Sequence, residues 1–134
     1  METQPLRVMV VDDNPVVADR LVALLKEDPR IDVCDRVESG LLAFARIAAD
    51  RPDAVLMDLE MPGIGGLAAI RRIKALVGPP AIVVVTFHDT EEKRREAAQA
   101  GADAFVPKSR VAQDLLPTLL AMLPQAPSQG EAAA

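Results

Sequence analysis

The chain has 134 residues, of which 50% are hydrophobic and 26% are charged, a balance typical of one globular domain rather than of a disordered segment. Its formal net charge of -5 disfavours a nucleic-acid-binding surface, because a phosphate backbone attracts a positively charged face. The single cysteine, Cys34, excludes an internal disulfide, and no apolar run approaches the length of a membrane span, so we expect a cytoplasmic protein without a membrane partner.

Five short apolar runs alternate with five helical patterns along the chain. In chain order, the expected strands cover residues 7–11, 31–37, 53–57, 81–85 and 102–106. The expected helices follow them at residues 15–28, 40–49, 67–76, 90–100 and 111–123. Repeated strand–helix units predict a doubly wound α/β fold, in which a five-stranded parallel sheet carries helices on both of its faces.

Capping residues mark the beginnings of several of these helices. Asn14 and Pro15 suit the N-cap and the first helical position of the first helix, which Pro29 would stop. Asp89 and Glu92 have the spacing of a capping box, with Asp89 as the N-cap of the fourth helix. We therefore expect both helices to begin at a side chain that accepts hydrogen bonds from backbone N–H groups.

Prolines and composition set the boundaries of the C-terminal part. Pro107 ends the fifth apolar run and indicates an edge strand, because proline has no N–H for a neighbouring strand. Pro117 falls inside the last helix, so this helix either starts late, near Asp114, or is kinked. Residues 124–134 are rich in Pro, Gln, Ser and Ala, and predict a disordered tail or the start of a linker after a domain spanning residues 1–123.

Charged and polar side chains stand at the ends of four of the five expected strands. Asp12 and Asp13 follow the first strand, Asp58 follows the third, Thr86 follows the fourth, and Lys108 stands just past the fifth. Ligands of such sheets bind outside the carboxyl ends of the strands. If the strand order is 2-1-3-4-5, the three aspartates converge where the first and third strands lie side by side.

Three carboxylates at one point need a positive partner, because like charges repel one another. Mg²⁺ suits oxygen ligands and keeps several waters, so two or three protein oxygens suffice. We expect Asp13 and Asp58 as direct ligands and Asp12 as a ligand through water. Lys108 adds a second positive charge and Thr86 adds a hydroxyl, and the whole set matches the needs of phosphoryl transfer to a carboxylate.

These residues occur in motifs that resemble the receiver domains of bacterial response regulators, including chemotaxis regulators. The motifs are Val-Val-Asp12-Asp13, Met57-Asp58-Leu59-Glu60-Met61-Pro62-Gly63, Val85-Thr86 and Phe105-Val106-Pro107-Lys108. The similarity covers about residues 7–123, and both the order and the spacing of the motifs fit the family. The resemblance implies a flavodoxin-like sheet with the strand order 2-1-3-4-5.

The resemblance also implies how the acidic residues act. Asp58 would be the residue phosphorylated by a histidine kinase or by a phosphotransfer protein. Asp13, Asp58 and the backbone carbonyl of Glu60 would bind Mg²⁺, with Asp12 nearby. The protein would then be a signalling domain rather than an enzyme, with at most self-catalysed phosphorylation and dephosphorylation.

Two further residues of the motifs would connect phosphorylation to an output. Thr86 and Lys108 would contact the phosphoryl group, Thr86 would swing inward, and Phe105 would follow as an aromatic switch. The surface of the fourth helix, the fifth strand and the fifth helix would then change its partners. The family often has a proline after the lysine, with a cis peptide bond, whereas Ser109 follows Lys108 here, so the cis bond is not carried over.

The sequence leaves the output itself open. The chain could be a stand-alone receiver that works by protein contact, or the receiver half of a longer transcription factor cut in its linker. The residues from Phe105 to Ser109 resemble receivers that precede a helix-turn-helix domain. We expect an effector domain or a downstream protein as partner, a homodimer that depends on phosphorylation as a further form, and no direct nucleic-acid binding by this domain.

Two other classes of function compete with this interpretation. Glu60 lies two residues past Asp58, where phosphohydrolases with an aspartyl-phosphate intermediate carry an acid–base carboxylate, although so short a chain shows no cap domain. A nucleotide- or flavin-binding domain would need a Gly-rich loop after the first strand, where Asp12-Asp13-Asn14-Pro15 stands instead. His88 is expected to be a solvated loop residue, which together with Glu60 could tune the rate of phosphate loss.

Overall fold

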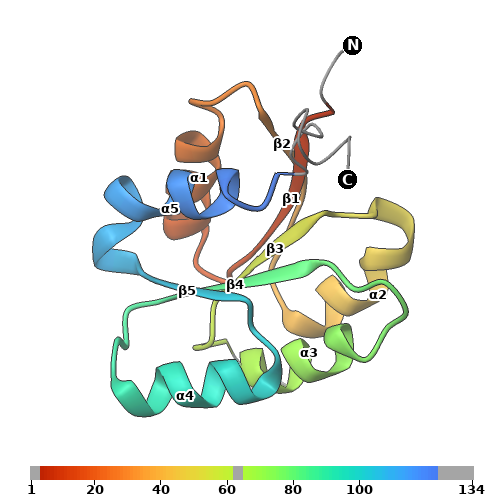
Figure 1. The fold of residues 1–134 in the computed structure, drawn as a ribbon, viewed down its shortest axis with the longest axis vertical. Helices are drawn as coiled ribbons and strands as arrows, with labels where there is room; N and C mark the ends of the chain where they lie inside the picture. Colours follow the sequence, from red (N-terminus) through yellow and green to blue (C-terminus); the bar gives the residue numbers. More distant parts are fainter. Residues whose placement is uncertain (1–3, 62–64, 124–134) are drawn as a thin grey trace, which may run out of the picture.

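The five strands of the protein form one parallel sheet in a computed structural model that describes residues 4–61 and 65–123. The strands are β1 (Leu6–Val11), β2 (Ile31–Val37), β3 (Ala54–Met57), β4 (Ala81–Thr86) and β5 (Ala104–Pro107). Their order across the sheet is β2-β1-β3-β4-β5, and every neighbouring pair is parallel (Figure 1). The expected doubly wound sheet with the flavodoxin-like order is therefore confirmed.

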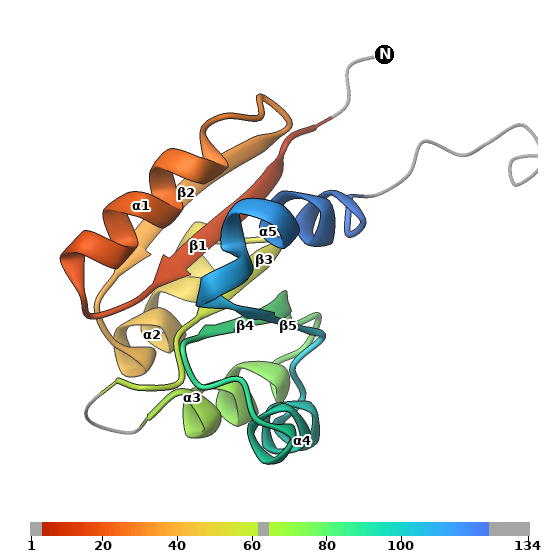
Figure 2. The ribbon, with the colours of Figure 1, turned by 90° about the vertical axis from the view of Figure 1, so that its left-hand side faces the viewer.

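Helices cover both faces of this sheet, as Figure 2 shows. The helices are α1 (Pro15–Leu25), α2 (Gly40–Asp50), α3 (Gly65–Lys74), α4 (Glu91–Ala100) and α5 (Val111–Leu120). α1 and α5 pack on one face, whereas α2, α3 and α4 pack on the other (Figures 1 and 2). None of the helices in the described part of the chain has both the length and the apolar character that a membrane crossing requires.

The core is aliphatic and is divided by the sheet into two layers. Successive residues of a strand point to opposite faces, so Val8 and Val10 of β1 pack with α1 and α5, whereas Met9 and Val11 pack with α2 and α3. All four side chains are almost completely buried. Because both faces are covered, the central strands β3 and β4 are continuous apolar runs, whereas the edge strand β2 carries Asp32, Asp35 and Arg36.

α1 begins as its sequence predicts but ends earlier. Asn14 Oδ1 accepts hydrogen bonds from the backbone N–H groups of Val16 and Val17, at 3.0 and 3.2 Å. The expected end near residue 28, at Pro29, is wrong, because the helix ends at Leu25. The backbone N–H groups of residues 27 and 28 bond to carbonyls only three residues back, which tightens the chain into turns before the proline is reached.

The cap of α4 differs from the expected capping box. Thr90 is the N-cap, and its hydroxyl accepts a hydrogen bond from the backbone N–H of Lys93 at 3.1 Å. Asp89 instead pairs with Arg94, whose Nε lies 2.7 Å from Asp89 Oδ1. The prediction of Asp89 as the N-cap is therefore wrong, because a cation one turn into the helix takes up its carboxylate. The helix stops at Gly101 as predicted, in a left-handed conformation with φ 113°.

The last helix contains Pro117 without starting late. A 3₁₀ turn (Lys108–Arg110) leads directly into α5 at Val111, so a start near Asp114 is wrong. Pro117 has no N–H group, which leaves the carbonyl of Gln113 without its usual helical partner. Pro62, Gly63 and the expected tail at residues 124–134 lie outside the described residues. The described residues contain no cis peptide bond, the Lys108–Ser109 bond included.

Candidate functional site

Backbone pairing brings the ends of β1 and β3 together. Val11, the last residue of β1, is the register partner of Met57, the last residue of β3. The backbone N–H of Asp58 donates to the carbonyl of Val11 at 3.1 Å, which continues the pairing one step past β3. The residues that follow these two strands, Asp12 and Asp58, must therefore lie side by side at the carboxyl edge of the sheet.

Three aspartates gather at this edge. One carboxylate oxygen from each of Asp12, Asp13 and Asp58 lies within 4.8 Å of the other two. Asp12 and Asp58 are 3% and 4% exposed, whereas Asp13 is exposed, so the cluster opens to solvent on the side of Asp13. The backbone N–H of Asn14 donates to Asp12 Oδ1 at 2.9 Å and holds that carboxylate in place.

Lys108 brings a positive charge to the buried side of the cluster. Its ammonium nitrogen lies 2.9 Å from Asp12 Oδ2 and 3.5 Å from Asp58 Oδ1, and its side chain is only 6% exposed. The contact with Asp12 is an ion pair without hydrogen-bond geometry, so the buried Oδ2 has no hydrogen-bond partner among the described residues. One ammonium faces three carboxylates, so the cluster keeps an excess of negative charge and of oxygen donors.

This excess of oxygen donors fits a divalent cation. Carboxylate oxygens are the ligands that Mg²⁺ takes in proteins, and a cation would neutralise the charge that Lys108 leaves uncompensated. A small cavity of about 150 Å³ adjoins the cluster and is lined by Asp12, Asp13, Pro15, Arg36 and Glu38. The acidic cluster could therefore hold a metal ion.

Burial and the neighbouring groups shift the pKa of Asp58 in opposing directions. Burial raises the pKa of the Asp58 carboxyl above its ordinary value, because the charged form loses hydration. The backbone N–H of Glu60, which donates to Asp58 Oδ1 at 3.1 Å, and the charge of Lys108 lower this pKa, whereas the charge of Asp12 raises it. A buried carboxylate of raised pKa beside a lysine is a typical feature of functional sites.

Thr86 lies at the same edge, and its hydroxyl is bound to the side chain of Glu60. Thr86 is the last residue of β4 and is fully buried. Its Oγ1 donates to Glu60 Oε1 and accepts a hydrogen bond from the backbone N–H of His88 at 3.1 Å. His88 Nδ1 lies 3.2 Å from the same Glu60 oxygen, and the His88 side chain is 64% exposed. The solvated loop position that the sequence predicts for His88 is correct, but the ring also contacts Glu60.

Phe105 lies on β5, away from the acidic cluster. It is half-buried, and the guanidinium of Arg94 lies 4.6 Å from the centre of its ring. Asp89, in the loop before α4, forms an ion pair with the same guanidinium. Arg94 of α4 thus contacts β5 through a cation–π interaction.

Phe87 is a residue of this region that sequence reasoning missed. The residue is 66% exposed, and Lys108 Nζ lies 4.8 Å from the centre of its ring. The position directly after Thr86 was the available signal, since an aromatic residue there must lie at the rim of the acidic cluster. The Lys108 ammonium therefore makes a cation–π contact with this exposed residue in addition to its ion pair with Asp12.

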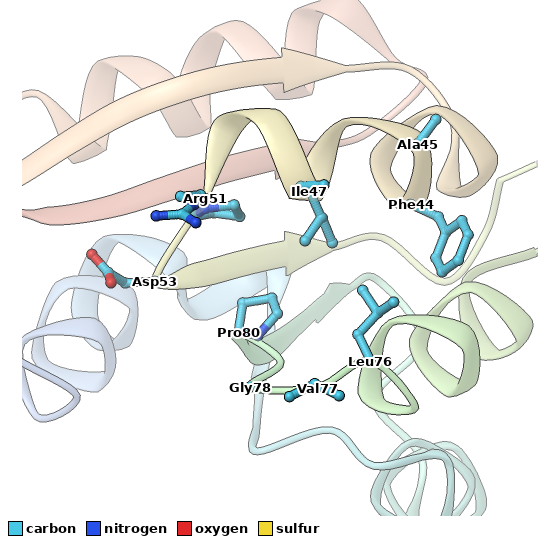
Figure 3. A pocket seen from close by; sticks show the side chains of 11 residues that line it. Phe44, Ala45, Ile47, Arg51, Asp53, Leu76, Val77, Gly78 and Pro80 are labelled. Carbon is cyan, nitrogen blue, oxygen red and sulfur yellow. The ribbon is translucent and has the colours of Figure 1, made fainter.

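A larger cavity lies at the opposite edge of the sheet and is separate from the acidic cluster. Its volume is about 750 Å³, and it opens between the ends of α2 and α3, at the amino ends of β3 and β4 (Figure 3). Phe44, Leu76 and Val77 form much of its apolar wall, with Arg51 and Asp53 at its rim. The strand β3 separates this cavity from Asp58, so none of the predicted site residues reaches it.

Comparison with known proteins identifies the family. A family model described as "Response regulator receiver domain" matches residues 8–120. A protein-glutamate methylesterase/protein-glutamine glutaminase of Koribacter versatilis is 36% identical over 117 residues, and one of Myxococcus xanthus is 45% identical over 112 residues. These alignments cover 86% and 81% of the chain but only 32% and 31% of the two relatives, so the chain spans about a third of their length.

A solved structure supports the same assignment. The response regulator domain of Thermotoga maritima CheB, known from a crystal structure, matches with a TM-score of 0.83 and 27% sequence identity. The match covers 92% of the chain and 100% of that domain. The similarity therefore extends over nearly the whole chain.

Proposed function

The chain belongs to the family of response regulator receiver domains, and we propose that its Asp58 accepts a phosphoryl group from a histidine kinase or a phosphotransfer protein. The observation that carries the proposal is the position of the Asp58 carboxylate. It is buried at the carboxyl end of β3, 3.5 Å from the Lys108 ammonium and grouped with Asp12 and Asp13. Aspartate is the typical phosphorylation site of two-component receivers.

The transfer needs a carboxylate nucleophile and compensation for the charge of the phosphoryl group. One Asp58 oxygen attacks the phosphorus, a P–O bond forms, and the P–N bond to the imidazole of the donor breaks with its electron pair left on nitrogen. Such transfer relies on positioning and electrostatic stabilisation. Burial raises the pKa of Asp58, whereas Lys108 lowers it and so favours the ionised form that attacks.

Asp12, Asp13, Asp58 and the backbone carbonyl of Glu60 are the proposed Mg²⁺ ligands. The bound ion supplies positive charge that neutralises the carboxylates and the phosphoryl oxygens. The grouping of the three carboxylates and the exposure of Asp13 support this assignment, because the cluster combines several oxygen donors with a side that is open to solvent. Lys108 keeps its place on the buried side and contacts a phosphoryl oxygen after transfer.

Thr86 and Phe105 are the proposed switch residues. Thr86 moves its hydroxyl to the phosphoryl group, and the β4–α4 segment moves with it. Phe105 then leaves the half-buried position beneath Arg94, which changes the surface of α4, β5 and α5. This surface controls a partner protein, an effector domain or a second copy of the chain, and the domain itself does not bind nucleic acid.

The extent and location of the domain belong to the same proposal. Residues 1–123 form the receiver, and residues 124–134 are a tail or the start of a linker. The named relatives are enzymes about three times as long as the part that aligns with this chain, and their catalytic activity is not carried over. We place the protein in the cytoplasm, where it meets its kinase.

The competing phosphohydrolase has less support at this site. Ligand pockets are commonly about 300–1,000 Å³, whereas the cavity beside Asp12 and Asp13 has about 150 Å³. The Glu60 carboxylate, which a hydrolase would need as its acid–base group, is hydrogen-bonded to Thr86. A site of this size suits a phosphoryl group presented by a macromolecule better than a small phosphate ester.

Acetyl phosphate labelling tests the proposal directly. Incubation with acetyl phosphate and Mg²⁺ should add the mass of one phosphoryl group to the intact protein, and Asp58→Asn should abolish the addition. Omission of Mg²⁺ should slow the labelling strongly. Unlabelled wild type, or labelling that survives in Asp58→Asn, would refute the proposal, and multiple turnover of a phosphate ester would favour the hydrolase.

A further inference from the structure

The hydroxyl of Thr86 is already engaged by a side chain of the neighbouring loop. A threonine hydroxyl has a single proton to donate, and Thr86 Oγ1 donates it to Glu60 Oε1. The same oxygen accepts one hydrogen bond, from the backbone N–H of His88 at 3.1 Å. A phosphoryl oxygen on Asp58 can receive the Thr86 proton only after the bond to Glu60 has broken.

We propose that Glu60 is a positioning residue whose carboxylate competes with the phosphoryl group for the Thr86 hydroxyl, and so holds the receiver in its unphosphorylated state. The inference rests on the proposed phosphorylation of Asp58. It adds that the Glu60 carboxylate determines how readily the Thr86 hydroxyl becomes available to the phosphoryl group. The side chain of Glu60 takes this role, whereas its backbone carbonyl remains a proposed metal ligand.

The surroundings of Glu60 strengthen its hold on the hydroxyl. The bond joins an ionised acceptor to a fully buried donor, and hydrogen bonds to charged groups are the stronger class. His88 Nδ1 lies 3.2 Å from the same oxygen, so Glu60 contacts both ends of the segment that follows β4. The two contacts connect Glu60, which follows β3, to Thr86 and His88 at the end of β4.

The strength of this competition can be expressed as an affinity. The Glu60 side chain is 33% exposed, which weakens the bond relative to a buried one. Loss of the Glu60 acceptor should then tighten binding of a phosphoryl analogue to Asp58 by about tenfold, which corresponds to about 1.4 kcal/mol. A negative Glu60 would also repel a phosphoryl group through space, and this effect would be independent of the Thr86 hydroxyl.

A double-mutant cycle separates the two effects. The probe is beryllofluoride with Mg²⁺, and its dissociation constant is measured by calorimetry because the chain has neither Trp nor Tyr. Glu60→Met removes the acceptor at similar length, and it is combined with Thr86→Val, which removes the hydroxyl at similar shape. We expect Glu60→Met to tighten beryllofluoride binding about tenfold when Thr86 is present and less than about twofold in the Thr86→Val background.

Two further variants complete the cycle. Thr86→Ser keeps a hydroxyl and should restore most of the effect of Glu60→Met, and Thr86→Ala is a second hydroxyl-free background if Thr86→Val does not fold. Glu38→Met is the matched charge control. Glu38 is exposed and lines the cavity beside Asp12 and Asp13, so its loss removes a negative charge near the site and should change affinity by the same factor in every Thr86 background.

The outcomes distinguish this inference from the proposed function. An equal gain from Glu60→Met with and without the Thr86 hydroxyl would show that Glu60 acts by charge repulsion, and would overturn the inference while the proposed function stands. If Glu60→Met gives no gain in affinity when Thr86 is present, the inference is overturned in the same way. A wild-type protein that neither binds beryllofluoride nor becomes labelled at Asp58 would overturn both.

Discussion

The ammonium of Lys108 is the positive charge that the buried part of the acidic cluster requires in the absence of a metal. Its side chain is 6% exposed, 2.9 Å from Asp12 Oδ2 and 3.5 Å from Asp58 Oδ1. Lys108→Met keeps a chain of similar length and removes the charge. We expect this change to lower the free energy of unfolding by about 3–5 kcal/mol in EDTA, because it leaves two buried carboxylates without a cation.

The magnitude follows from the geometry. At an effective dielectric constant of about 20, the attractions across 2.9 and 3.5 Å amount to about 6 and 5 kcal/mol. The desolvation of the buried ions costs several kcal/mol each and offsets much of this attraction. Protonation of Asp58 limits the loss, since burial already raises its pKa. The destabilisation should therefore be largest at neutral pH and shrink as the pH falls.

Urea denaturation followed by far-UV circular dichroism measures the effect. Wild type and Lys108→Met are compared in EDTA and in excess Mg²⁺, where a cation bound to the cluster should recover part of the loss in the variant. Lys93→Met is the control, because the Lys93 side chain is 40% exposed and its Nζ lies 3.6 Å from Glu96 Oε1, a pair worth at most about 1 kcal/mol. A Lys108→Met protein within about 1 kcal/mol of wild type in EDTA would refute the reasoning.

Three further predictions concern stability. Asp58→Asn should raise the free energy of unfolding of the metal-free protein at neutral pH, because burial raises the pKa of Asp58 and so makes its ionised form costly in the folded state. This gain in stability should appear as the pH rises through the raised pKa and should vanish below the ordinary value of about 3.9. A gain that does not depend on pH would contradict the prediction. Gly66→Ala should cost about 1–3 kcal/mol in urea denaturation, because the added Cβ would lie 2.6 Å from the Asp58 carbonyl oxygen and 2.7 Å from Leu59 Cα; unchanged stability would argue against this close approach. Thr90→Ala should cost about 1 kcal/mol in the same assay and Asp89→Ala less, because Thr90 is the N-cap and Asp89 forms an exposed ion pair; the reverse order would reassign the cap.

Sequence reasoning succeeded where the signal is local. Most of the strands are apolar runs with a clear end, and the residue after that end must lie at the carboxyl edge of a parallel sheet. Asp12, Asp58 and Lys108 were placed in this way, and the structure brings their charged groups within ion-pairing distance. Asn14 and Pro15 marked the start of α1 for the same reason, because a cap bonds to its own neighbours in the chain.

Sequence reasoning failed where two segments compete for one side chain. Asp89 has the spacing of a capping box, but Arg94 binds its carboxylate, and Thr90 becomes the cap. The contact between Glu60 and Thr86 joins residues 26 positions apart, and no local pattern predicts it. The ring of Phe87 over Lys108 likewise depends on where two different loops meet.

The sequence by itself determined the class of this protein: five strand–helix units, an aliphatic core, and an ordered set of residues at the strand ends. These follow from periodicity and spacing, which are properties of single segments. Only the tertiary structure decided that Lys108 faces Asp12 more closely than Asp58, and that the Thr86 hydroxyl is bound by Glu60. The reason is that side-chain partners at a sheet edge come from different loops, and their choice depends on burial, charge and distance after those loops have packed.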